Sequence, residues 1–96
     1  MKVIPTKVFL NEFDKLEKSD YQAAMKIVEK IKQVERWELI KEKLVWYPGL
    51  YKSRIWKYRL IYMQDGDKII VLATVRKREV SYRDLDKTLA NIRKYL

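Results

Sequence analysis

The sequence predicts an α+β domain in which a helical hairpin packs on one face of a mainly antiparallel sheet. Three observations lead to this prediction. The first half of the chain carries two apolar stripes at helical spacing, the second half carries three strand-like runs, and a further helical stripe closes the sequence. The expected order is β-α-α-crossover-β-β-β-α, and residues 1–96 are expected to form a single domain.

The first half is expected to be mainly helical. A short strand at residues 3–4 is followed by Thr6, whose hydroxyl can cap a helix over residues 6–17. A second helix is expected over residues 20–35, with Ser19 as its cap. The two helices are separated by a turn of two or three residues, which is typical of an antiparallel helical hairpin.

The middle of the chain leads into the sheet. Residues 36–48 are apolar without a clean period, which predicts a short helix or an irregular crossover. Residues 50–56 and 58–63 then alternate, but their basic residues are one place out of phase. This phase change predicts a tight turn or a bulge near Trp56 and Lys57.

The last part of the chain adds a buried strand and a helix. Asp65 and Gly66 form a strong hairpin signal. The continuous apolar run at residues 69–75 predicts a central strand that is covered on both faces. Residues 84–96 carry a helical stripe that Ser81 or Asp84 can cap.

Composition narrows the possible chemistry. The chain has no cysteine and no histidine, so it lacks thiolates, the usual general base and the commonest metal ligand. We therefore expect no metal and no small-molecule cofactor. The longest uncharged apolar run, residues 69–75, is far shorter than the roughly 20 residues that span a bilayer. We expect a cytoplasmic protein that makes no use of a membrane.

Charge is the most informative property of the sequence. Lys and Arg number 22 against 13 Asp and Glu, which gives a net charge of +9. Residues 49–96 hold 12 of the basic residues and only 5 of the acidic ones. A positive charge concentrated in one half of a domain is typical of proteins that bind polyanions such as RNA.

Five basic residues of the second half are expected to converge on one surface of the sheet. They are Lys52, Arg54, Arg59, Arg76 and Arg78. They could simply form a solvated face, but like charges opposite one another destabilise a sheet, which favours a surface that meets phosphates. Tyr82 lies in a polar connector and is expected to be exposed, where it could stack on a base.

Several segments of residues 48–83 together resemble the RelE/ParE toxin superfamily, and the element order resembles it over the whole chain. The segments are LYKSR (50–54), YRLIY (58–62), the DGD turn (65–67), the IIVL strand (69–72) and KRE (77–79) before Tyr82. The resemblance implies a RelE-like fold. It also implies a type II toxin–antitoxin toxin that cleaves mRNA in the ribosomal A site and so inhibits translation.

The resemblance also implies which residues act and what they meet. The catalytic positions of RelE-like members fall on Lys52, Arg54, Arg59, Arg78 and Tyr82. Neighbouring cations are expected to contact RNA or the ribosome; they are Lys57, Arg76, Lys77 and Arg83. The implied partners are mRNA, the ribosome and an acidic, RelB-like antitoxin.

The residues themselves are consistent with metal-independent RNA cleavage. Arginine does not lose its proton at physiological pH, so Arg54, Arg59 and Arg78 can only stabilise charge or donate hydrogen bonds. Lys52 is the candidate general base, because neighbouring cations favour the uncharged amine. Two other functions stay open. One is inhibition of DNA gyrase in the manner of ParE, and the other is a non-catalytic RNA-binding remnant of the family.

Overall fold

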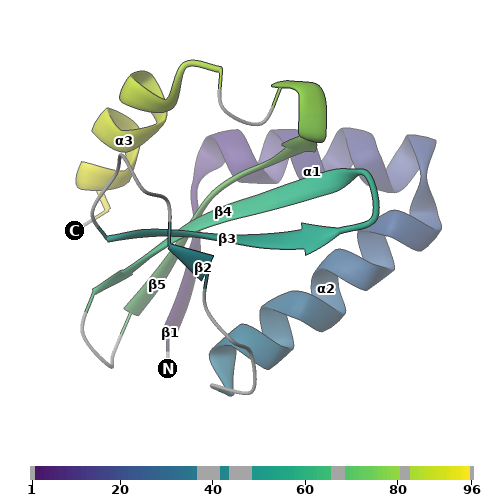
Figure 1. The fold of residues 1–96 in the computed structure, drawn as a ribbon, viewed down its shortest axis with the longest axis horizontal. Helices are drawn as coiled ribbons and strands as arrows, with labels where there is room; N and C mark the ends of the chain where they lie inside the picture. Colours follow the sequence, from purple (N-terminus) through teal and green to yellow (C-terminus); the bar gives the residue numbers. More distant parts are fainter. Residues whose placement is uncertain (1, 37–41, 44–48, 66–68, 81–82, 96) are drawn as a thin grey trace.

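A five-stranded sheet organises the chain, with two helices on one face and a third helix on the other (Figure 1). The computed structural model describes residues 2–36, 42–43, 49–65, 69–80 and 83–95. Its elements in chain order are β1 (Lys2–Pro5), α1 (Lys7–Ser19), α2 (Tyr21–Glu35), β2 (Glu42–Lys43), β3 (Leu50–Ile55), β4 (Tyr58–Asp65), β5 (Ile69–Lys77), the 3₁₀ helix η1 (Arg78–Val80) and α3 (Leu85–Arg93).

The strands lie in the order β1-β5-β4-β3-β2. β1 runs parallel to β5, and every other neighbouring pair is antiparallel, so the predicted α+β class and the mainly antiparallel sheet are confirmed. β2 is an addition to the prediction: its two residues pair with β3 where a short helix or irregular crossover was expected. The rest of that crossover, residues 37–41 and 44–48, lies outside the described part of the chain.

Side-chain caps fix the start of both helices in the hairpin. The Thr6 hydroxyl accepts a hydrogen bond from the Phe9 N–H at 3.1 Å and donates one to the Ala73 carbonyl at 3.0 Å, so it caps α1 and ties it to β5. Asp20 caps α2 by accepting from the Ala23 N–H. The expected cap, Ser19, is instead the last residue of α1, because that helix continues two residues beyond its predicted end.

β5 is buried on both faces, as the apolar run predicted. Ile70 and Leu72 belong to the core beneath α1 and α2, whereas Val71 and Ala73 belong to a second core beneath α3. The register between β4 and β5 shifts at Ala73, which forms a bulge. Each face of the sheet therefore has its own apolar core.

The connections between the last three strands are short. Trp56 and Lys57 form the turn between β3 and β4, which confirms the predicted tight turn. Asp65 pairs with Ile69, so β4 and β5 form the expected hairpin, although residues 66–68 lie outside the described residues. No helix in the described part of the chain is long and apolar enough to cross a membrane.

The α3 side of the sheet is divided along its length. Leu50 and Ile61 lie beneath α3, which Figure 1 shows at the end of the sheet away from the β3–β4 turn. Toward that turn, the same face carries Lys52 and Arg54, two and four residues after Leu50, and Arg59, two residues before Ile61. The apolar end of this face is thus packed on a helix, and the other end is cationic.

Candidate functional site

A small pocket lies at the cationic end of the sheet. Its volume is about 200 Å³, and its described lining consists of Lys52, Arg54, Arg59 and Arg78. The structure therefore brings together four of the five residues expected to act in catalysis. The fifth, Tyr82, lies outside the described residues, as does Ser81. We call these four residues the cationic pocket.

Strand geometry places the first three of these side chains. Lys52 and Arg54 are two residues apart on β3, so they point to the same face. Arg59 on β4 lies directly opposite Arg54 in the antiparallel pair, which puts both guanidinium groups on that face. Arg78 follows β5, and its backbone N–H donates to the Lys57 carbonyl at 2.8 Å, which holds the start of η1 beside the β3–β4 turn.

Arg59 is the most buried member of the pocket, with only 8% of its surface exposed. Its Nη1 donates to the Tyr58 carbonyl at 3.0 Å and to the Trp56 carbonyl at 3.5 Å. Arg59 thus braces the turn with one side of its guanidinium group while it lines the pocket. Arg54 and Arg78 are exposed, and Lys52 is half-buried.

The charge of the cationic pocket defines what it can bind. The four lining residues are all basic, and none of the described residues that line it is acidic. Arg54 and Arg59 lie directly opposite each other across β3 and β4, so two guanidinium groups come close together on this face. Guanidinium groups can grip two phosphate oxygens at once, so the arrangement suits a phosphate group.

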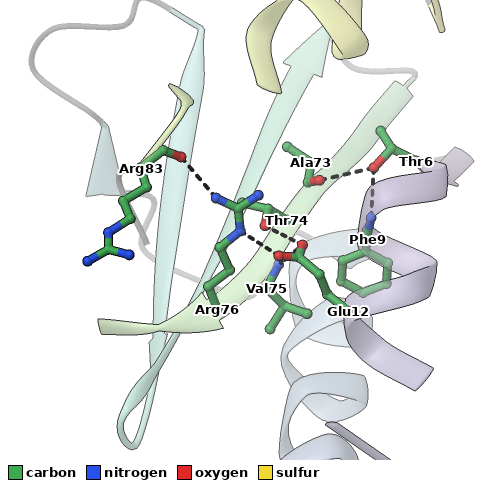
Figure 2. Close-up of polar contacts among 8 residues, drawn as sticks. All are labelled: Thr6, Phe9, Glu12, Ala73, Thr74, Val75, Arg76 and Arg83. Atoms are coloured by element: carbon green, nitrogen blue, oxygen red, sulfur yellow. Dashed lines mark hydrogen bonds and ion pairs between the residues drawn. The ribbon is translucent and has the colours of Figure 1, made fainter. Parts of the chain in front are cut away.

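Arg76 lies directly opposite Arg59 in the β4–β5 pair, so the register puts it on the predicted face, but its guanidinium group is engaged by other partners. Figure 2 shows its guanidinium group between two partners: Nε donates to the Glu12 carboxylate, and Nη1 donates to the Arg83 carbonyl at 2.9 Å. Arg76 is not among the described residues that line the cationic pocket. Its side chain is only 21% exposed in this ion pair, and its expected contact with RNA stays a prediction.

Glu12 on α1 holds several groups at the edge of β5 (Figure 2). Besides Arg76, its carboxylate accepts from the Thr74 hydroxyl and from the Val75 N–H. β1 pairs with β5 only as far as Leu72, so Glu12 takes the place of a neighbouring strand beyond that point. Through Arg76 and the Arg83 carbonyl, the same carboxylate is connected to the segment that follows Arg78.

The remaining predicted RNA contacts are close to the pocket residues in the sequence. Lys57, Lys77 and Arg83 are exposed. The Lys57 ammonium group lies 5.6 Å from the centre of the Tyr58 ring, a cation–π distance. None of the three is among the described residues that line the pocket, and their contact with RNA or the ribosome stays a prediction.

Comparison with known proteins yields matches at the level of structure. No family model matches the sequence, and no curated protein matches it. The YoeB dimer of Staphylococcus aureus has a TM-score of 0.70 and 24% identity, covering 81% of this chain and 97% of that one. A YoeB/ParE toxin from Agrobacterium tumefaciens has a TM-score of 0.70 and 16% identity, covering 81% and 99%. The fold is that of the YoeB/ParE toxins.

A third match comes from a toxin–antitoxin complex. It is the heterotetrameric YoeB–YefM complex of Staphylococcus aureus, with a TM-score of 0.67 and 22% identity, covering 81% of this chain and 97% of the matched chain. YoeB and ParE toxins are members of the RelE/ParE-like superfamily, so the resemblance inferred from the sequence is confirmed for the fold.

Sequence reasoning missed Glu12, which a residue pattern could have revealed. Phe9 and Leu16 are buried on α1, and Glu12 lies three residues after the first and four before the second. A carboxylate on the apolar stripe of a helix needs a buried partner, because burying an unpaired charge is costly. In this YoeB/ParE-like fold the partners are Arg76 and the edge of β5.

The described residues also bear on metals. Nowhere in them do three or more His, Cys, Asp or Glu side chains come together in a way that could hold a metal ion. The Glu12 carboxylate accepts hydrogen bonds from Arg76, Thr74 and Val75. The described lining of the cationic pocket in this YoeB/ParE-like fold consists of Lys and Arg side chains.

Proposed function

We propose that this protein is the toxin of a type II toxin–antitoxin system and that it cleaves mRNA in the ribosomal A site. The observation that carries the proposal is the cationic pocket: Lys52, Arg54, Arg59 and Arg78 line one hollow of a YoeB/ParE-like fold. The site of action would be the cytoplasm, where ribosomes translate.

The proposed reaction uses the nucleophile that RNA itself carries. The 2′-oxygen attacks the adjacent phosphorus, the bond to the 5′-oxygen breaks, and the products carry a 2′,3′-cyclic phosphate and a 5′-hydroxyl. Lys52 takes the proton from the 2′-hydroxyl. The guanidinium groups of Arg54, Arg59 and Arg78 neutralise the charge that develops on the phosphate oxygens and donate hydrogen bonds to the leaving 5′-oxygen. That oxygen takes its proton from a water molecule, and the hydroxide left behind is neutralised by the proton that Lys52 received.

The ribosome supplies what so small a site lacks. Four cations can bind a phosphate group, but they do not align a 2′-oxygen with the phosphorus and the leaving oxygen. mRNA held in the A site can be bent into that alignment, and orientation of this kind contributes large rate factors. The proposed substrate is therefore mRNA on the ribosome, and Tyr82 is proposed to stack on one of its bases.

Ribosome dependence is tested by comparing two substrates. Purified protein should cleave mRNA on ribosomes that are stalled with an empty A site, and it should leave the same naked RNA intact. Efficient cleavage of naked RNA at low protein concentration would contradict the ribosome requirement. Intact mRNA with altered DNA supercoiling after induction would instead support gyrase inhibition.

We further propose an acidic antitoxin as the partner of this chain. The support is the net charge of +9 and the likeness to a chain of the YoeB–YefM toxin–antitoxin complex. An acidic segment laid over the cationic pocket would neutralise its charge and block access of mRNA. No small-molecule cofactor is needed for the proposed reaction.

A further inference from the structure

A second hollow lies next to the cationic pocket, between α2 and the β3–β4 turn. Its volume is about 210 Å³. Its described lining consists of Lys26, Glu29, Lys30, Gln33, Arg54, Ile55 and Trp56. Arg54 belongs to both hollows, so the two meet at this side chain. We call it the Trp56 groove.

Trp56 is unusual in both its exposure and its backbone. Its surface is 58% exposed, although a side chain of this size usually contributes to a core. Its φ is 54°, in the left-handed region that tight turns normally fill with Gly, Asn or Asp. A bulky residue in this conformation is an outlier, and such outliers concentrate at functional sites.

The turn is held in place by residues of the cationic pocket. Arg59 donates to the carbonyls of Trp56 and Tyr58, and the Arg78 N–H donates to the carbonyl of Lys57. The indole ring is therefore presented by a braced turn rather than by a loose loop. A pre-organised aromatic surface loses little entropy when a ligand stacks on it.

The charges around Trp56 favour a polyanion. Lys26, Lys30 and Arg54 are basic, and the one acidic residue in the described lining, Glu29, forms an exposed pair with Lys26 at 3.5 Å. Exposed pairs of this kind contribute little stability and exchange readily for another partner. An exposed aromatic ring beside several cations is the combination with which proteins bind single-stranded nucleic acid.

We propose that the Trp56 groove binds single-stranded RNA. One base stacks on the Trp56 indole ring, and the phosphates on either side of it lie near Arg54 and Lys30. The inference deepens the proposed function, because the bound strand would be the stretch of mRNA that continues from the cationic pocket. A protein partner is less well suited to this groove, since four of its seven described lining residues are charged.

The experiment measures RNA binding without ribosomes and without cleavage. A fluorescently labelled octamer of uridine is titrated with the full chain, and the dissociation constant is read from fluorescence anisotropy. Trp56→Gly removes the ring, and Gly is the residue that best tolerates a φ of 54°, so this variant should fold. We expect it to bind the octamer at least about fivefold more weakly.

Two variants serve as controls. Trp56→Tyr keeps an aromatic face and should bind the octamer within about twofold of the wild type. Tyr21→Ala removes an aromatic residue that is 61% exposed at the start of α2 but is not in the described lining of the groove, and it should leave the affinity unchanged.

A third variant tests the phosphate contact. Lys30→Gln should lower the slope of log affinity against log salt by about 0.7, as expected for one lost phosphate contact.

The outcomes separate this inference from the proposed function. If folded Trp56→Gly, checked by circular dichroism, binds the octamer as tightly as the wild type, the Trp56 groove is not an RNA site. The same conclusion follows if Trp56→Gly weakens only a complex with another protein. If the wild type fails to cut mRNA on ribosomes but Trp56→Gly still loses RNA affinity, the groove stands and the nuclease proposal fails.

Discussion

At the scale of single residues, Arg78 is the member of the cationic pocket whose role can be tested most directly. Its side chain is exposed, so its removal should not disturb the core, and it is set beside the β3–β4 turn by its own backbone hydrogen bond. We expect Arg78→Ala to lower single-turnover cleavage on programmed ribosomes by roughly 10²–10³-fold, the usual cost of losing one group that stabilises transition-state charge.

The adjacent residue provides a matched control. Lys77 is also exposed but is not in the described lining of the cationic pocket, so Lys77→Ala should reduce cleavage only slightly. Arg78→Lys should restore part of the activity at most, because an ammonium group cannot grip two phosphate oxygens. Equal damage from Lys77→Ala and Arg78→Ala would show that the proposed site is wrong.

Lys52 is proposed to act by accepting a proton, which distinguishes it from the arginines. We expect Lys52→Ala to abolish most of the single-turnover cleavage. Its affinity for ribosomes should stay nearly intact, because only one of many phosphate-facing charges is removed. Lys52→Arg keeps the charge but cannot act as a base, so it should not restore cleavage. If Lys52→Arg cleaved as fast as the wild type, Lys52 would serve only as a positive charge.

At the scale of elements, much of the fold followed from the sequence. The helical spacing of apolar residues predicted the helical hairpin, the phase change of the basic residues predicted the β3–β4 turn, and the continuous apolar run predicted the doubly covered β5. These patterns reflect directly which side chains are buried. The bulge at Ala73 and the two-residue β2 could not be predicted, since both depend on how a strand pairs with its neighbour and not on the strand's own residue pattern. The cap of α2 was misplaced by one residue because neighbouring Ser19 and Asp20 can each cap a helix.

The site was predicted less completely than the fold. The convergence of Lys52, Arg54, Arg59 and Arg78 followed from alternation along the strands and from the resemblance to RelE-like toxins. Arg76 fits the same alternation of basic residues along its strand. No local sequence pattern reveals, however, that it forms an ion pair with Glu12, which lies 64 residues earlier. A contact between distant residues of this kind becomes visible only in the folded chain.

Glu12 also supports a prediction about the packing of α1 on β5. Its carboxylate is 22% exposed and binds Arg76, the Thr74 hydroxyl and the Val75 N–H. Glu12→Ala leaves these donors without their acceptor, so we expect the free energy of unfolding to fall by about 1–3 kcal/mol in urea denaturation. Glu17→Ala removes an exposed carboxylate from the same helix and should change it by less than about 0.5 kcal/mol.

The two outcomes for Glu12 have different meanings. A large loss of stability for Glu12→Ala alone would establish the carboxylate as the anchor of the β5 edge beyond β1. If Glu12→Ala were as stable as Glu17→Ala, the contacts of Glu12 at this edge would make no net contribution to the free energy of unfolding. The Arg76 ion pair would then have little effect on the segment that follows Arg78.

At the scale of the whole molecule, the two faces of the sheet have different roles. The face beneath α1 and α2 is the main apolar core, and the other face is split between a smaller core under α3 and the cationic pocket. The helix and the pocket share one sheet face, so the same strands carry the second core and the candidate site. Extending α3's apolar cover toward the turn would require replacing the cations of that face.

The division of this face leads to a prediction about the antitoxin. An acidic partner that neutralises this chain should contact the cationic pocket, so reversing a charge there should weaken the complex. We expect Arg54→Glu to weaken binding to the acidic product of an adjacent reading frame by at least about tenfold in a titration at physiological salt. Lys87→Glu makes the same charge change at an exposed position on α3 and should have little effect, although both variants have the same net charge. Equal weakening by both variants would mean that only the net charge of the chain matters.

Growth provides a separate test of the same partner. Co-expression should restore the growth of cells in which the wild-type chain alone is harmful, because the acidic partner would cover the cationic pocket. Normal growth without any partner would argue for a non-toxic RNA-binding protein.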